Sequence, residues 1–289
     1  MVNVIKAVTK EPNIISEKIT IRPSSLDSYV ACPQQWYNVF ILGKKTIPNI
    51  RATIGTGVHK GAELLWKESI AAKKKVINID VVEGASIESF RKEIKDKEDT
   101  NFDNLTMNQA ESLVREGTNA FVNDIVPQVD IPENVEERRT IEFDHKVVKC
   151  LSGTIDYITN TTTADIKTSK RKIIPTSYDL QQSTYVLLAE FGKKQKIHKT
   201  NIQGVVFGRN ETYGSISEVP IDREMVKYII NNLLAKLDLL YTGKIDPAIL
   251  FPGNHKYYLC NDRFCNLRPT CKFVNQTSRR FENGQNHFG

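Results

Sequence analysis

Apolar residues recur at helical spacing through most of the first half of the chain. The spacing predicts helices whose ends follow from capping residues and from breaks in the pattern. Ser24-x-x-Asp27 has the form of a capping box behind Pro23, so we expect the first helix to start at Ser24. Pro33 suits the first position of a second helix that runs to about Leu42. Further helices are expected at residues 54–75 and 86–127, the latter broken near 98–104.

After about residue 138 the pattern changes to alternating apolar and polar positions, which is typical of strands. Strands are expected at residues 139–148, 151–158, 163–168, 202–207 and 214–219, and helices at residues 177–191 and 222–241. Turns at Lys149-Cys150 and Asn160-Thr161 would make the first three strands an antiparallel meander. The order of elements predicts an α/β fold, with a mixed central sheet flanked by helices and preceded by a helical insertion.

A chain of 289 residues, 40% of them hydrophobic, can bury one elaborated domain. We expect a single domain over residues 24–273, preceded by an extended lead-in at residues 1–23. Its parts would be a helical insertion at about 76–130 and an irregular tail at 244–273, with residues 274–289 disordered.

The first twenty residues lack the apolar run of a signal peptide, and no apolar run is long enough to cross a bilayer. This predicts a cytoplasmic protein without membrane contact, in a bacterium or a phage. Thiols are normally reduced there, so the five cysteines should be metal ligands or bystanders rather than disulfides. A net charge of +6 permits a groove for nucleic acid without proving one.

Two carboxylates and a lysine stand close together in the predicted meander. Asp156 closes the strand motif Gly-Thr-Ile-Asp, and Asp165-Ile-Lys167 lies on the next strand. Residues i and i+2 of a strand share a face, so Asp165 and Lys167 point together, and a tight hairpin would bring Asp156 beside them. Such a group can hold Mg²⁺ or Mn²⁺ and hydrolyse a phosphodiester. A surface salt-bridge ladder across two strands is the alternative.

Further residues make the pattern resemble the RecB-like branch of the PD-(D/E)XK nuclease superfamily. The strand motif GTID is followed by DIKTSK and then by Gln181-x-x-x-Tyr185, whose two residues share one helical face. The resemblance implies a restriction-endonuclease-like core, with Asp156 and Asp165 as metal ligands. It also implies that Lys167 orients water or stabilises charge, and that Gln181 and Tyr185 line the substrate groove.

His59 stands in Gly55-Thr-Gly-Val-His59, ahead of apolar helix positions. A lone histidine there is more often a cap or a solvated side chain. RecB-like nucleases carry a similar Gly-x-x-ψ-His element, and the resemblance implies that His59 is a third metal ligand. The segment lacks the pattern of a phosphate-binding P-loop.

Four cysteines form a one-plus-three arrangement. Cys32 precedes a proline, and Cys260, Cys265 and Cys271 are clustered in the loop-rich tail, whereas Cys150 lies in a strand pattern. Three clustered cysteines indicate a metal centre. A subset of RecB-like nucleases, including AddB-type and CRISPR-associated ones, carries this layout. The resemblance therefore implies a [4Fe–4S] cluster that staples the tail to the N-terminal helix, with tetrahedral Zn²⁺ as the alternative.

The resemblance thus implies a Mg²⁺- or Mn²⁺-dependent nuclease that degrades single-stranded DNA from its ends in recombination or repair. The basic run Lys170-Arg-Lys172 follows the catalytic strand and could contact phosphates, although such runs are usually solvated faces. A structure-selective endonuclease, an RNase and a non-catalytic DNA-binding subunit of a helicase or recombination complex remain alternatives. DNA in preference to RNA follows from the resemblance alone.

Overall fold

The computed structural model describes residues 18–44, 48–97, 100–193, 195–257, 260–261, 265, 267–271 and 273–274. Within it the chain divides into two compact units, each assembled from separate stretches of sequence. The terminal unit comprises Met1–Thr46, Glu142–Leu151 and Lys227–Gly289, and the central unit comprises Ile47–Ile141 and Ser152–Val226. The expectation of a single domain over residues 24–273 stays a prediction, and the tail predicted to be disordered lies outside the described residues except for Val274.

The central unit contains a mixed sheet. Its strands are β2(Asn134–Glu142), β3(Val148–Ile158), β4(Thr162–Ser169), β5(Lys199–Phe207) and β6(Thr212–Glu218), with the first residues of β3 and the last of β2 assigned to the terminal unit. Strand β3 pairs with β2 and, in antiparallel fashion, with β4, while β5 is parallel to β4 and antiparallel to β6. The predicted mixed central sheet is confirmed.

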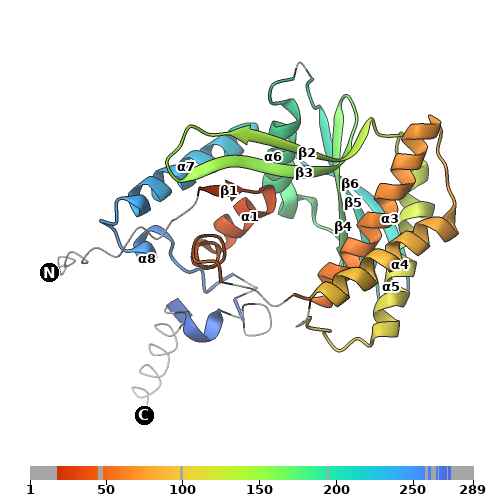
Figure 1. Ribbon diagram of the computed structural model, residues 1–289, viewed down its shortest axis with the longest axis horizontal. Coiled ribbons are helices and arrows are strands. Elements are labelled where there is room, and N and C mark those ends of the chain that lie inside the picture. The colour runs from red at the N-terminus through yellow and green to blue at the C-terminus, as the bar shows by residue number, and fades with distance from the viewer. Residues whose placement is uncertain are drawn as a thin grey trace, which may run out of the picture. The chain divides into compact units, whose positions relative to one another are not determined.

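Helices α3(Ile50–Ala72), α4(Ile79–Asp96) and α5(Met107–Ala120) lie side by side next to strands β4 to β6 (Figure 1). Ile166 of β4 and Val205 of β5 pack with these helices in one apolar core around Trp66. Helix α6(Asp179–Glu190) contacts the opposite face, where the Gln182 side chain accepts a hydrogen bond of 2.8 Å from the Thr200 hydroxyl. The sheet is therefore covered by helices on both faces, as predicted.

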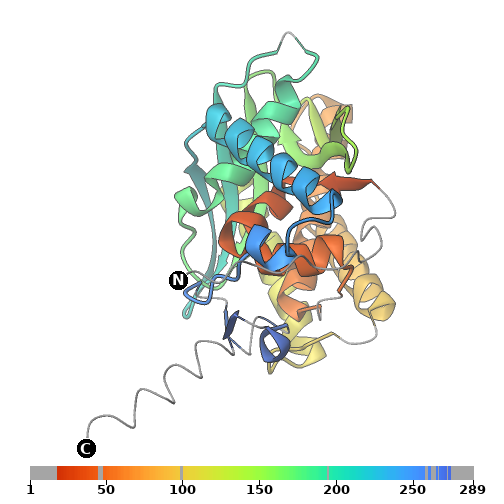
Figure 2. The ribbon, with the colours of Figure 1, turned by 90° about the vertical axis from the view of Figure 1, so that its left-hand side faces the viewer.

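The terminal unit brings the two ends of the described chain together. It contains β1(Ile19–Ile21), α1(Pro23–Ala31), α2(Pro33–Trp36) with a π-helical turn at Tyr37–Ile41, most of α7(Arg223–Tyr241), and α8(Pro247–Leu250). The red helix α1 and the blue helices α7 and α8 lie side by side in Figure 2. The Tyr29 hydroxyl donates a hydrogen bond of 2.8 Å to Asn232 of α7, and Trp36 and Tyr37 stack on Phe251.

Several helix starts differ from the expected positions because other residues cap them. Helix α1 begins at Pro23, and the Ser25 hydroxyl bonds to both the N–H and the C=O of Arg22, so the predicted start at Ser24 is wrong by one residue. Helix α3 begins four residues early because Asn49 caps it by accepting from the Arg51 N–H. Helix α4 likewise begins at residue 79, after its cap Asn78. The break expected near residues 98–104 is confirmed, since α4 and α5 are separate helices.

The expected turn at Lys149-Cys150 is wrong. Strand β3 runs unbroken through both residues, and the chain reverses before it, where the His145 ring accepts the N–H groups of Val147 and Val148. The turn at Asn160-Thr161 is confirmed, with Thr159 bonded to Thr162. Strand β1, which lies in the expected lead-in, pairs in parallel with the start of β3. Among the described residues no helix combines the length and apolar character needed to cross a membrane.

Candidate functional site

The candidate active site lies in the central unit, next to the short ladder that joins β3 to β4. The strands pair at Tyr157 and Ala164. At Asp156, one residue before Tyr157, the side chain rather than the backbone of β3 bonds to β4. Its Oδ2 atom accepts a hydrogen bond of 2.8 Å from the N–H of Ile166. The bond fixes the orientation of a carboxylate that is almost wholly buried.

Three potential metal ligands from three elements meet at this point. One ligand atom each of His59 on α3, Glu136 on β2 and Asp156 on β3 lies within 4.8 Å of the other two. The Nδ1 atom of His59 is 3.3 Å from Oδ2 of Asp156, and 28% of the His59 side chain is exposed. Carboxylate oxygens with an imidazole nitrogen suit a divalent cation such as Mg²⁺ or Mn²⁺.

The electrostatics of the group are also those of a cation site. Burial raises the pKa of Asp156, and the charge of Asp165 raises it further. Burial and the charge of Asp156 raise the pKa of Glu136 to about 7. Burial lowers the pKa of His59, although Asp165 acts in the opposite direction, so its neutral, ligating form is favoured. A divalent cation would stabilise the charged carboxylates that burial and mutual repulsion disfavour.

Sequence reasoning missed Glu136. The first strand was expected to begin at Arg139, but β2 starts at Asn134 and includes Glu136. The backbone of Glu136 is left-handed, with φ of +51°, which is rare for a residue with this side chain. Such strain persists where the surrounding structure imposes it, and it often accompanies function. An acidic residue just ahead of an alternating strand pattern was the one available signal.

Asp165 and Lys167 form an ion pair beside the three-ligand group. The Nζ atom of Lys167 is 2.6 Å from Oδ2 of Asp165, whose side chain is only 3% exposed. Burial alone would lower the pKa of Lys167, but the charge of Asp165 and the hydrogen bond to it outweigh burial and raise the pKa. Lys167 is thus held as a cation, and it also lies 6.0 Å from the centre of the Tyr178 ring.

Helix α6 adds Gln181 and Tyr185. Both side chains are buried, and the Gln181 amide nitrogen donates a hydrogen bond of 3.3 Å to the Tyr185 hydroxyl. Burial raises the pKa of Tyr185, and the charges of Asp165 and Asp156 raise it further. The tyrosine therefore keeps its proton and lies within electrostatic reach of both carboxylates.

An open cleft of about 520 Å³ leads to this group. It lies along α3 from Ala52 to Glu63, and the other walls come from β2, β4 and Ser89 of α4. His59, Glu136 and Lys167 line it. A substrate in the cleft could therefore reach the metal-ligand group and the lysine together. The helical insertion supplies part of the wall through α4.

The six residues predicted for the active site lie in one region of the central unit: His59, Asp156, Asp165, Lys167, Gln181 and Tyr185. The three-ligand group differs from the predicted ligand set in one member, because it contains Glu136 and the nearby Asp165 is paired with Lys167. A bound cation and two or three carboxylates next to a fixed ammonium are the parts that metal-assisted phosphodiester hydrolysis needs.

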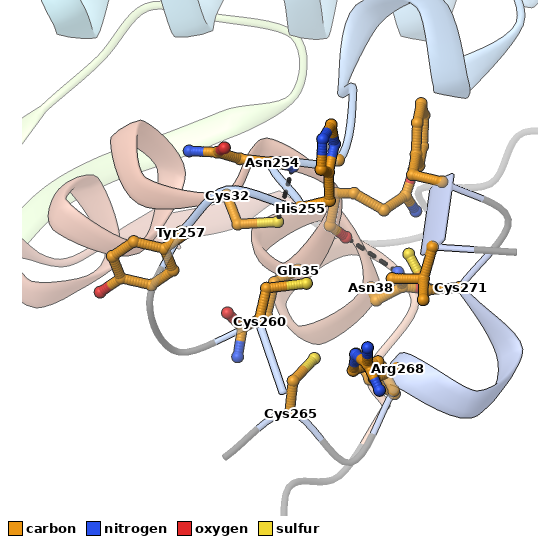
Figure 3. Close-up of a pocket in the computed structure, with 15 residues that line it drawn as sticks. Cys32, Gln35, Asn38, Asn254, His255, Tyr257, Cys260, Cys265, Arg268 and Cys271 are labelled. Carbon is orange, nitrogen blue, oxygen red and sulfur yellow. Dashed lines mark hydrogen bonds between the residues drawn. The ribbon is translucent and has the colours of Figure 1, made fainter. Parts of the chain in front are cut away.

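The four cysteines predicted as cluster ligands lie together in the terminal unit. Cys32, at the junction of α1 and α2, lines one pocket with Cys260, Cys265 and Cys271. Their sulfur atoms point toward a common space, as Figure 3 shows. The Cys32 sulfur accepts the N–H of Asn254 at 3.5 Å, which ties the junction to the tail. The fifth cysteine, Cys150, is buried in β3.

The thiols of this pocket influence one another. Burial raises the pKa of Cys260, and the neighbouring thiolates of Cys32 and Cys271 add to the effect. Burial likewise raises the pKa of Cys265, again with contributions from the other three cysteines. The raised pKa values of Cys260 and Cys265 favour their protonated forms, and a bound metal centre would displace those protons. Four thiols around one space have the donor chemistry of an iron–sulfur or zinc centre.

Comparison with known proteins agrees with this fold and site. The family model of the PD-(D/E)XK nuclease superfamily matches residues 20–272. The chain belongs to the PD-(D/E)XK nuclease superfamily.

A crystal structure from Eubacterium rectale, of a protein provisionally named an exonuclease, is similar with a TM-score of 0.51 and 11% identity. The similarity covers 78% of this chain and 83% of that one, and it shows a shared fold. The crystal structure of the protein SSO0001 aligns over 92% of this chain and 90% of its own at 13% identity, but a TM-score of 0.38 is too low to support an inference. No curated protein matches the sequence.

Proposed function

We propose that the protein is a metal-dependent deoxyribonuclease that degrades single-stranded DNA from its ends. One observation supports the chemistry above all others: His59, Glu136 and Asp156 come within 4.8 Å of one another in an open cleft, beside an ion-paired lysine. A buried salt bridge would not need three further ligands at its side. Membership of a nuclease superfamily points to the same chemistry.

Each residue has a role in this proposal. His59, Asp156 and Asp165 hold the cation, and Glu136 adds an oxygen ligand that the sequence did not suggest. Mg²⁺ or Mn²⁺ in this position would polarise a phosphoryl oxygen and acidify an attacking water. Lys167 orients that water, or offsets negative charge that develops on the phosphate. Gln181 and Tyr185 support the bound DNA strand through their buried, hydrogen-bonded side chains.

The preference for free ends is the finer part of the proposal. Ser89 of the helical insertion lines the cleft, so the entrance is bounded by a helix as well as by the sheet. A flexible single strand can be threaded into such a cleft by its end, whereas an intact duplex must first open. The E. rectale fold neighbour is provisionally named an exonuclease, in keeping with this mode. A structure-selective endonuclease is the alternative.

Linear and covalently closed single-stranded DNA of the same sequence separate these two modes. With Mg²⁺ or Mn²⁺, the linear strand should be shortened to small products while the circle persists. Equal loss of both substrates would show an endonuclease. A matched RNA strand should resist cleavage if the enzyme is specific for DNA.

We further propose that Cys32, Cys260, Cys265 and Cys271 hold a [4Fe–4S] cluster, with Zn²⁺ as the alternative. Zinc sites more often use two close Cys-x-x-Cys pairs, whereas these cysteines are arranged as one plus three, which favours the iron–sulfur cluster. Because Cys32 is far from the other three in sequence, the centre would stabilise the fold by closing a long loop.

A further inference from the structure

One carboxylate joins two cations at the edge of the central unit's cleft. The Oδ2 atom of Asp103 is 3.2 Å from Nε of Arg51, on the first turn of α3, and 3.2 Å from Nζ of Lys170, just after β4. The Asp103 side chain is 13% exposed, whereas the side chains of Arg51 and Lys170 are 25% and 49% exposed. The acid is thus the inner member of the cluster, and the two cations are the outer ones.

The loop that carries Asp103 is held firmly. Asp103 and Asn104 are both left-handed, with φ of +48° and +63°, a conformation that Asp and Asn tolerate better than most residues. The Asp103 N–H donates to the Asn101 side chain at 2.9 Å. The backbone of Asn101 is bonded in turn to Pro48 and Ile50, at the start of α3. Asp103 therefore has a fixed position from which it can orient both cations.

The cluster adjoins one end of the cleft. Arg51 is next to the lining residue Ala52, and Lys170 comes two residues after the lining residue Thr168. At Gly55, one turn along α3, the helix is so close to the strand that an added Cβ would be 2.9 Å from the Thr168 hydroxyl. Arg51 lies eight residues from the metal-ligand candidate on α3, or about 12 Å along the helix axis. That distance suits a neighbouring phosphate rather than the one being cleaved.

Much of the hydrogen-bonding capacity of the two cations is unused. Arg51 donates to Asp103 through Nε alone, and its two terminal nitrogens have no partner in the part of the chain that the structure describes. Within the same residues Lys170 bonds only to Asp103. Since the two cations share one carboxylate, each is only partly neutralised by it. Exposed Arg171 and Lys172 follow Lys170 directly.

We propose that Arg51 and Lys170 form a phosphate-binding clamp for the backbone of a single-stranded nucleic acid, and that Asp103 holds the clamp in shape. The guanidinium supplies paired donors that match the oxygens of a phosphate, and the ammonium supplies a second charge. The clamp binds a phosphate of the strand next to the cleaved one. This proposal rests on the proposed function in one respect: the nucleic-acid strand that occupies the cleft is the substrate of the nuclease.

The test compares Arg51→Gln/Lys170→Gln with the matched control Arg115→Gln/Lys95→Gln. The control removes the same charge from α4 and α5, including one member of the Arg115–Glu83 ion pair. The affinity for a labelled single-stranded oligonucleotide is measured without divalent metal over a series of salt concentrations. Loss of the one phosphate that the clamp binds should reduce the slope of log affinity against log salt by about 0.7. The control should keep the wild-type slope.

A second readout separates the clamp from the active site. Turnover of bis(p-nitrophenyl) phosphate with Mn²⁺ should be unchanged in Arg51→Gln/Lys170→Gln, because this diester is too small to reach the clamp. An unchanged salt slope with a lowered unfolding temperature would overturn the clamp and make the cluster a structural tie. If the salt slopes of the wild type and Arg51→Gln/Lys170→Gln differ but the wild type does not cleave DNA, the clamp stands and the nuclease proposal is removed. Absence of any strand binding would remove both.

Discussion

The carboxylate of Asp156 accepts the backbone N–H of Ile166 at 2.8 Å, so a side chain on β3 caps a free amide on β4. The bond orients the carboxylate toward His59. It also holds Asp156 next to strand β4, which carries the Asp165–Lys167 ion pair. An amide oxygen at position 156 could accept the same bond without carrying a charge. Replacing Asp156 by Asn therefore separates the structural role of the hydrogen bond from the role of the charge, and this gives the first prediction.

Asp156→Asn should abolish cleavage, with a loss of about 10²-fold or more, because a neutral amide is a poor ligand for a hard cation. The metal-free variant should unfold at the same temperature as the wild type or higher, because a neutral amide replaces a carboxyl group whose charge burial disfavours, and the bond to Ile166 is kept. Thermal unfolding without metal and a cleavage assay test the two parts. A large drop in unfolding temperature would mean that the carboxylate serves folding rather than metal binding.

Glu136→Gln should weaken Mn²⁺ binding by roughly tenfold or more, because affinity for a hard cation depends on the number of charged oxygen ligands. The unfolding temperature of the variant should rise less than that of the wild type when Mn²⁺ is added. Glu133→Gln makes the same chemical change at an exposed position three residues away and should behave as the wild type. Equal Mn²⁺ affinity in the two variants would remove Glu136 from the site.

Protein purified without oxygen should be brown and contain about four irons and four sulfides per chain. Cys32→Ser should bleach it and lower the unfolding temperature, because the proposed centre would link α1 to the tail. Cys150→Ser is the control: its sulfur contacts the Thr20 hydroxyl at 3.5 Å, away from the other four cysteines. Absorption spectra with iron and zinc analyses provide the readout. Colourless protein with one zinc per chain would replace the cluster by a zinc staple.

Glu190 gives a pH-dependent prediction away from the active site. Its carboxylate accepts two hydrogen bonds from Arg223, which lower its pKa, and a third from the N–H of Ile197. A lowered folded-state pKa stabilises the protein above the unfolded pKa of about 4.3, and this contribution disappears as the pH falls through the folded value.

Glu190→Gln should therefore lower stability at pH 7 by about 1 kcal/mol, or ~2–4 °C in unfolding temperature. The difference from the wild type should shrink as the pH is lowered below about 4. Exposed Glu218→Gln serves as the control. A difference that stays constant down to pH 3 would show that packing, not charge, holds Glu190.

The residues that sequence reasoning identified share one property: each belongs to a short local pattern. Asp165 and Lys167 are two apart on a strand, and Gln181 and Tyr185 are four apart on a helix, so the spacing alone places each pair on one face. The tail cysteines were evident for the same reason. Relations of this kind survive errors of several residues in the ends of an element.

The features that were missed depend on contacts between distant residues. Glu136 joins the ligand group through the path of β2 and through a left-handed backbone that no local pattern announces. Strand β1 is only three residues long and exists because it pairs with the start of β3, far along the chain. The Arg51–Asp103–Lys170 cluster likewise joins three segments. Such arrangements follow from packing, which the sequence pattern does not specify.

The central proposal is that Asp165 and Lys167 on strand β4, next to a bound cation, carry out the cleavage of DNA. The decisive measurement is the rate at which end-labelled, linear single-stranded DNA is degraded with Mn²⁺, and without it, by the wild type, Lys167→Ala and Lys199→Ala. Lys199 is an exposed lysine at the start of β5 and serves as the control. We predict Mn²⁺-dependent degradation by the wild type and Lys199→Ala, and a loss of about 10²-fold or more in Lys167→Ala. Degradation by Lys167→Ala at the wild-type rate, or degradation without any divalent metal, would contradict the account.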